Sequence, residues 1–208
     1  MDKLAKLKLF AWGLSLGVAV VAVAGWGQQL RWQLGGISSY KLFPLFGLLA
    51  FSLMWSHYII SAVRQYLNIE KSQLKNYIET TSMGVLAALA LHPGLLVWQL
   101  WRDGFGLPPS SYLQNYVAPT LRWVAVLGSI SLFIFFAYEL RRIYSDRSWW
   151  KYVVYATDAA MVAIFVHSLN LGSTLKNSWL GTLWYVYAAL FAAALGYIYY
   201  KKFTSSNP

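Results

Sequence analysis

Apolar residues in this chain gather into six long runs that are separated by short polar stretches. A hydrocarbon core about 30 Å thick is crossed by about 20 apolar residues in helical conformation. We therefore predict an all-α, polytopic membrane protein, a six-helix bundle in which residues 1–208 form a single transmembrane domain. The predicted spans are approximately residues 9–26, 42–63, 80–101, 117–138, 152–172 and 179–200.

The composition supports this interpretation. Of the 208 residues, 58% are hydrophobic and only 12% are charged, against about 25% charged residues in ordinary soluble domains. A chain with so few polar groups could not cover the surface of a soluble enzyme. The absence of cysteine also excludes disulfides, thiolate nucleophiles and iron–sulfur clusters.

The positions of the basic residues predict how the chain is oriented in the membrane. The net charge is +10, but the lysines and arginines lie between the apolar runs, which favours a membrane protein over a nucleic-acid-binding protein. With the N-terminus in the cytoplasm, the inner side carries Lys3, Lys6, Lys8, Arg64, Lys71, Lys75, Arg141, Arg142, Arg147, Lys151, Lys201 and Lys202. The outer side carries only Arg31, Lys41, Arg102, Arg122 and Lys176. This asymmetry predicts that both termini are cytoplasmic, in an integral multi-pass protein of a bacterial inner membrane.

The first span contains a stretch similar to a signal-peptidase site and a pair of glycines. Ala22, Val23 and Ala24 resemble a signal-peptidase site, but the apolar run is longer than the usual signal region of about 7–15 residues. Whether this span is cleaved stays open. Gly13 and Gly17 form a pair of small residues four apart, which predicts a face for close helix packing.

The three histidines are the most informative residues in the chain. His57, His92 and His167 all fall inside predicted spans, where ionisable groups are costly and are functional candidates by default. At about 1.5 Å per helical residue, His92 and His167 both lie roughly 18–22 Å above the inner boundary. His57 lies only about 9 Å from it. His92 and His167 therefore match in depth, and His57 does not match them.

Two depth-matched histidines on different helices can hold the iron of a haem from its two faces. Imidazole is a suitable ligand for iron, and an apolar bundle suits the macrocycle. A zinc site would need a third or fourth ligand at the same depth, and none is predicted there. We therefore predict one haem b with His92 and His167 as axial ligands of the iron. Arg122 and Arg102, on the outer side, are candidate contacts for the haem propionates.

Short motifs around these histidines resemble the ferric reductase-like transmembrane domain family. The third span contains His92, Pro93, Gly94, Leu95 and Leu96, similar to the His-Pro-x-Leu-Leu segment of that family. The fifth span begins with the aromatic–basic stretch 150–155 and ends with a histidine before Leu171 and Gly172. The resemblance covers roughly residues 42–200. The family includes NADPH oxidases, ferric-chelate reductases, the STEAP metalloreductases and the bacterial haem subunit of the periplasmic methionine sulfoxide reductase system.

The resemblance implies a membrane cytochrome that passes electrons to an outer-side acceptor. Members with two haems carry a further histidine about thirteen residues earlier on each helix, where this chain has Glu79 and Val154. The chain therefore resembles the single-haem members, as an oxidoreductase haem subunit that lacks its own flavin and NADPH domain. Electrons would come from a cytoplasmic-side donor, either a flavoprotein partner or the quinone pool.

A second polar group is predicted nearer the inner boundary. Asp158 is the only acidic residue well inside a predicted span, and its estimated depth of about 9 Å equals that of His57. The two residues could form an inner quinol or proton-handling site. A structural hydrogen bond between the second and fifth spans is the alternative.

Two other functions stay open from sequence alone. A haem-free helical membrane protein, such as a transporter or an assembly factor, would use the histidines as contacts between helices. A membrane anchor subunit of a quinone-linked oxidoreductase would share the haem and take electrons from quinol at the inner side. The haem content of the protein and its reduction by a quinol analogue distinguish these hypotheses.

Overall fold

The computed structural model describes residues 2–140 and 144–204, and the part of the chain it describes is helical with no strand. Six helical segments are long and apolar enough to cross a membrane, as predicted. They are α1 (Lys3–Gln29), α2 (Ser39–Tyr66), the segment Lys71–Arg102, the segment Pro119–Glu139, α7 (Trp150–Leu171) and α8 (Trp179–Thr204). Arg141 and Arg142, part of the predicted inner basic group, lie outside the described residues.

The first and third spans begin several residues before their predicted first residues, at Lys3 and Lys71, and the fourth begins slightly after its own, at Pro119. The third opens with a 3₁₀ turn, Lys71–Leu74, and continues as α3 (Lys75–Arg102). Leu74 and Tyr77 extend it because they are buried in a cluster with Leu7 of α1. The fourth begins with the 3₁₀ turn Pro119–Leu121 and continues as α5 (Arg122–Glu139). Proline is favoured in the first turn of a helix, where its missing N–H would have no partner, and this helical segment begins at Pro119 instead of residue 117.

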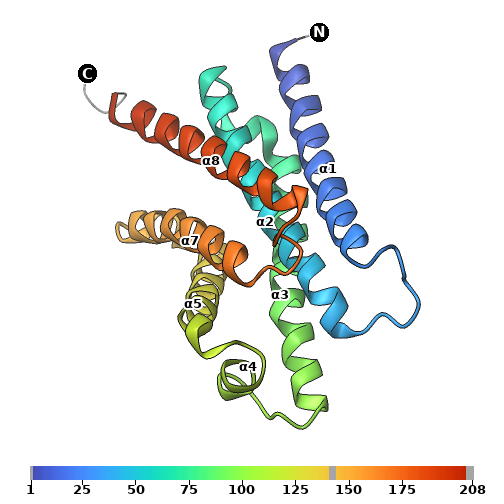
Figure 1. The fold of residues 1–208 in the computed structure, drawn as a ribbon. Helices are drawn as coiled ribbons and strands as arrows, with labels where there is room; N and C mark the ends of the chain where they lie inside the picture. Colours follow the sequence, from blue (N-terminus) through green and yellow to red (C-terminus); the bar gives the residue numbers. More distant parts are fainter. Residues whose placement is uncertain (1, 141–143, 205–208) are drawn as a thin grey trace.

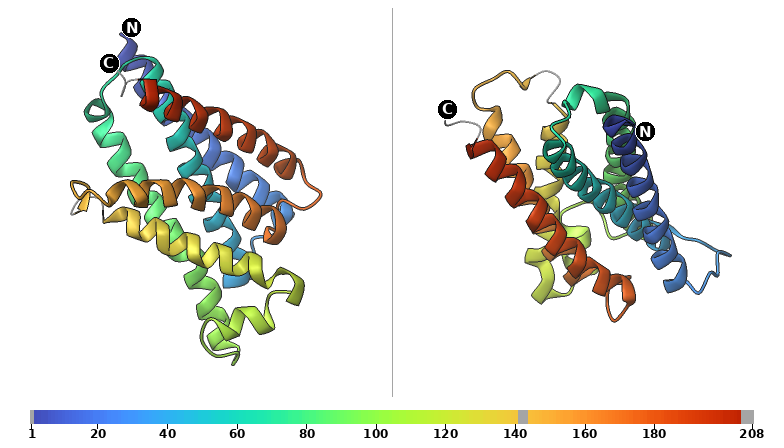
Figure 2. Two further views of the ribbon diagram at one scale, coloured as in Figure 1. Left: turned by 90° about the vertical axis from the view of Figure 1, so that its left-hand side faces the viewer. Right: turned by 90° about the horizontal axis from the view of Figure 1, so that it is seen from above.

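The helices pack mainly as two neighbouring pairs, α2 with α3 and α5 with α7, while α1 and α8 both pack on α2. Figure 1 shows α5 and α7 on the opposite side of α2 and α3 from α1. In the left view of Figure 2, α5 and α7 run alongside each other and cross the direction of α3. The start of α1 and the end of α8 lie at one end of the bundle (Figure 2). We call this the inner end.

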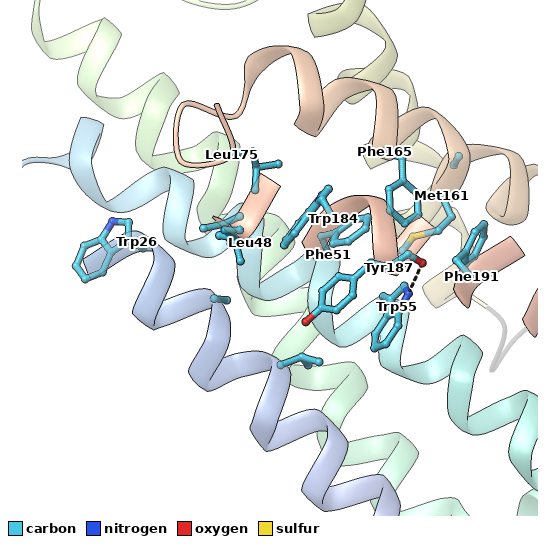
Figure 3. Close-up of a cluster of buried hydrophobic side chains, with 14 of the residues drawn as sticks. Trp26, Leu48, Phe51, Trp55, Met161, Phe165, Leu175, Trp184, Tyr187 and Phe191 are labelled. Atoms are coloured by element: carbon cyan, nitrogen blue, oxygen red, sulfur yellow. Dashed lines mark hydrogen bonds between the residues drawn. The ribbon is translucent and has the colours of Figure 1, made fainter. Parts of the chain in front are cut away.

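A large aromatic cluster joins α8 to α2 and α7 (Figure 3). The ring of Phe51 stacks on Trp184 and meets Phe165 edge to face, with centroids 4.6 Å apart in both pairs. Trp55 Nε1 donates a 2.8 Å hydrogen bond to the Tyr187 carbonyl. Since lipid tails are as apolar as these side chains, close packing and hydrogen bonds stabilise the cluster more than exclusion from water does.

The packing face of α1 is not the predicted one. A Cβ added at Gly13 or Gly17 would meet no atom within 4 Å. The buried face of α1 instead includes Ala11, Ser15 and Ala22, and the helix runs without interruption through the signal-like stretch. Ser15 Oγ lies 2.7 Å from Tyr77 Oη and 3.1 Å from Ser56 Oγ, which ties α1 to α2 and α3.

A candidate bis-histidine site and an inner polar cavity

The structure brings His92 and His167 together from two different helix pairs. Their ring centroids are 6.5 Å apart, and the ring planes are nearly perpendicular, at 85°. His92 belongs to α3 and His167 to α7, whose main neighbours are α2 and α5 respectively. The contact therefore lies where the two helix pairs meet.

The Nδ1 atom of each histidine is held by a backbone carbonyl of the neighbouring helix. His92 Nδ1 lies 2.8 Å from the Phe43 oxygen of α2, and His167 Nδ1 lies 3.0 Å from the Val124 oxygen of α5. Because a carbonyl oxygen only accepts, the hydrogen is on Nδ1 in both rings. Each Nε2 then carries a lone pair, which is the form in which neutral histidine binds a metal.

A glycine four residues after each carbonyl lets the imidazole approach. Phe43 is followed at this spacing by Gly47, and Val124 by Gly128. A Cβ at Gly47 would lie 2.7 Å from His92 Cε1, and a Cβ at Gly128 would overlap the ring of His167. Helical side chains lean toward the N-terminus, so a larger residue at either position would cover the carbonyl one turn before it. Both histidines are therefore seated in the same way.

The separation of the two rings is close to that of two imidazoles bound to one metal. Metal–imidazole bonds are about 2.0–2.1 Å long and each nitrogen is roughly 1.1 Å from its ring centroid, so two imidazoles on opposite sides of one metal have centroids about 6 Å apart. The observed 6.5 Å is close to that separation. In residues 2–140 and 144–204 no group of three or more His, Asp or Glu side chains is placed to hold a metal ion. A bis-imidazole haem needs no third protein ligand.

The segment between α3 and Pro119, at the end of the bundle away from the chain termini (Figure 1), reaches the histidine site through aromatic contacts. It contains the short helix α4 (Ser110–Asn115). Tyr116 stacks on Tyr40, with centroids 5.9 Å apart, and meets the edge of Phe43, whose carbonyl holds His92. Tyr40 Oη also donates a 2.8 Å hydrogen bond to Asp103. The loop thus packs against the helix turn that positions His92.

The two predicted propionate contacts lie on the surface. Arg102 is exposed and donates a 3.2 Å hydrogen bond to Gln99 Oε1. Arg122 is exposed and donates a 2.7 Å hydrogen bond to the Leu113 carbonyl. Along α5, Arg122 is six residues before Gly128, which corresponds to a rise of about 9 Å. Arg102 is ten residues beyond His92, a rise of about 15 Å.

His57 and Asp158 hydrogen-bond to different partners but line one cavity of about 380 Å³. Tyr58 Oη donates to Asp158 Oδ1 at 2.8 Å, and Tyr199 Oη donates to Asp158 Oδ2 at 2.5 Å. His57 Nε2 lies 2.7 Å from Thr81 Oγ1. The cavity contains both residues of the predicted inner site.

Sequence reasoning did not single out Gly47, Gly128, Tyr58, Tyr199 or Thr81. Gly47 and Gly128 are isolated glycines inside apolar spans, a pattern that indicates close approach by another group. Their partners could not be named without the helix packing. Tyrosine is frequent in this chain, which has 15, so Tyr58 and Tyr199 carried no signal.

Comparison with models of protein families, with curated proteins and with solved structures finds no match for this chain. Its function is therefore argued from the site.

Proposed function

We propose that the chain is a membrane cytochrome of the ferric reductase-like kind, with one haem b bound between His92 and His167. The observation that carries the proposal is the pair of imidazole rings 6.5 Å apart, each with Nδ1 on a backbone carbonyl. A haem held there would supply a one-electron ferric/ferrous couple. The protein would pass electrons from the inner side to an acceptor on the outer side.

The residues of the chain would prepare this site in two ways. The Phe43 and Val124 carbonyls fix the orientation of the rings and increase the basicity of Nε2, as outer hydrogen bonds do for metal-bound histidines. With both axial positions occupied by imidazole, no open iron position would remain for oxygen. Electron transfer is therefore favoured over oxygen binding at the iron.

The basic residues at the outer end would contact the propionates. Arg122 is the better candidate, because it lies about one and a half helical turns from Gly128, whereas Arg102 lies nearly three turns from His92. Both guanidinium groups are exposed, so reorienting either side chain would disrupt little packing.

The test is an absorption spectrum of the purified full chain, oxidised and then reduced with dithionite, with haem quantified per chain. We expect a low-spin b-type spectrum at one haem per chain. His92→Ala and His167→Ala should each abolish it. His57→Ala is the matched control and should leave it intact, because His57 bonds to Thr81 instead.

A rescue experiment separates ligation from folding. In His167→Gly the space of the ring is vacated, so added imidazole should restore the low-spin spectrum if His167 is an axial ligand. A wild-type protein that stays colourless with added haem would overturn the proposal and favour the haem-free membrane protein. Two haems per chain would mean that a further ligand pair exists.

A further inference from the structure

The inner cavity, lined by His57 and Asp158, is not used by the proposed haem site. It has a volume of about 380 Å³ and is lined by residues of α2, α3, α5, α7 and α8. That volume is near the lower end of the usual range for small-molecule pockets, about 300–1,000 Å³. Leu89, which lines the cavity, is three residues before His92, a rise of about 4.5 Å along α3. The cavity therefore extends to within one helical turn of the histidine site.

One polar wall of the cavity is built around Asp158 of α7. Both carboxylate oxygens accept hydrogen bonds from phenols, one from Tyr58 of α2 and the other from Tyr199 of α8. Three helices thus converge on one carboxyl group. An ionisable residue in a membrane span is expensive and is most often kept for function.

A second polar wall is formed by His57 of α2 and Thr81 of α3. Thr81 Oγ1 donates its hydrogen to the Tyr77 carbonyl at 2.8 Å, so it accepts from His57 Nε2. This fixes the neutral His57 ring with its hydrogen on Nε2 and makes Nδ1 the basic nitrogen.

We propose that this cavity binds the ring of a membrane-soluble quinol, and that the quinol is the electron donor to the haem of the proposed function, on which this inference rests. A para-quinol carries two hydroxyl groups at opposite edges of one apolar ring. The cavity offers apolar walls with polar groups on different helices, at Asp158 and at His57.

Flavin mononucleotide is the competing ligand for this cavity. A flavin phosphate would need cations, and Arg64, Lys71 and Lys202 line the cavity. Arg64 Nη1 donates a 2.7 Å hydrogen bond to the Ile69 carbonyl, and Lys202 Nζ donates to Tyr155 Oη at 3.1 Å. Both cations keep further N–H groups, so the binding test compares the quinone with flavin mononucleotide.

In the proposed reaction both O–H bonds of the quinol break, giving the quinone, two protons and two electrons. The haem that His92 and His167 would hold would supply a one-electron acceptor, so the electrons would leave one at a time. A one-electron acceptor on the outer side would take each electron in turn. The protons pass to Asp158 and His57, and from there to water at the inner end of the cavity.

Binding is measured by calorimetry on the purified full chain in lipid nanodiscs, with decylubiquinone as the probe and flavin mononucleotide for comparison. Val154→Phe tests the cavity itself, because Val154 lines it and a phenyl ring would occupy its volume. Val162→Phe is the matched control, on the same helix but 51% exposed. Asp158→Asn and His57→Gln test the two polar walls. The haem spectrum of every variant is recorded in parallel.

We expect the wild type and Val162→Phe to bind the quinone with equal affinity. Val154→Phe should weaken binding at least tenfold, and each polar variant several-fold, all with an unchanged haem spectrum. The reduced probe, decylubiquinol, should reduce the haem of the wild type under anaerobic conditions and do so more slowly in Val154→Phe.

Several results would overturn the inference. A wild type with an intact haem spectrum and no quinone binding would remove the donor site but leave the proposed cytochrome standing. Binding unaffected by Val154→Phe would place the quinone elsewhere, and binding of flavin mononucleotide in its place would identify a different donor. A protein that binds quinone but no haem would overturn the proposed cytochrome and the transfer step together.

Discussion

The histidine site and the inner cavity use polar groups in opposite ways. At the histidine site, the backbone holds each ring, through the Phe43 and Val124 carbonyls, and glycines allow the close approach. In the inner cavity, side chains hold side chains, and Asp158 is fixed by two phenols from other helices. The first arrangement fixes two ring positions rigidly. The second surrounds an open volume with groups that can exchange protons.

This contrast predicts that the two regions fail separately when their own residues are changed, and fail together only when the shared packing is lost.

The largest effect is expected for Trp184→Ala, because Trp184 belongs to the cluster that joins α8 to α2 and α7, the helices that carry groups of both regions. Its side chain is fully buried, stacks on Phe51 and donates a 2.9 Å hydrogen bond to Ser168, next to His167. Removing a buried aromatic ring costs about 3–5 kcal/mol. Thermal unfolding in detergent should show a large loss of stability, with weaker haem retention and weaker quinone binding. Tyr185→Ala, at an exposed position of the same helix, is the control. Loss of only one of the two functions would show that α8 supports a single region.

Gly128→Ala and Gly47→Ala should damage the histidine site alone. The added Cβ would overlap the ring of the facing histidine, and such overpacking costs about 1–3 kcal/mol. Spectral titration with haem should show weaker binding, while quinone affinity stays at the wild-type value. Gly94→Ala on α3 is the control, because its Cβ would meet no atom within 4 Å. Unchanged haem affinity in both glycine variants would contradict the proposed seating of the rings.

Tyr58→Phe and Tyr199→Phe should affect the inner cavity alone. Each removes one hydrogen bond to Asp158, which corresponds to about 0.5–1.5 kcal/mol. Calorimetry should show quinone affinity lowered a few-fold, and the haem spectrum should not change. A shift of the haem spectrum in either variant would show that the two regions are coupled.

The smallest effect is expected for Tyr77→Phe, which removes the hydrogen bond to Ser15 between α3 and α1. Hydrogen bonds between membrane helices average about 0.6 kcal/mol. The melting temperature should fall slightly, with haem binding at the wild-type value. Tyr77 lines the inner cavity, but only its hydroxyl is removed, so quinone affinity should change by less than in Tyr58→Phe. Tyr66→Phe, at a position 70% exposed, should leave the melting temperature unchanged. A several-fold loss of quinone affinity in Tyr77→Phe would make its hydroxyl a polar group of the inner site.

The helices were predictable because their signal is local. Six apolar runs of sufficient length identify six helices in almost any packing, since the backbone of a chain in lipid must satisfy its own hydrogen bonds. The start of α3 was missed because Leu74 and Tyr77 are stabilised by packing against α1 and do not belong to a long apolar run. The packing face of α1 was also wrongly predicted, since two small residues four apart indicate a face without showing which partner meets it.

The depths of His57, His92 and His167 followed from counting residues, and depth alone selected His92 and His167 as a pair. Their partners did not follow. Every residue has a backbone carbonyl, so the sequence does not mark those of Phe43 and Val124 as partners. The absence of a side chain at Gly47 and Gly128 matters only because a histidine ring faces each of them. In the same way, depth placed His57 and Asp158 at one level, but only the crossing of α2, α7 and α8 gave Asp158 its two phenols and left a cavity between the helices.

The sequence by itself determined the membrane-spanning helices and the depth of each polar group, because both depend on distance along one helix. The tertiary structure alone decided which groups meet, because rotation about each helix axis and the choice of neighbour depend on side-chain packing between segments far apart in the chain.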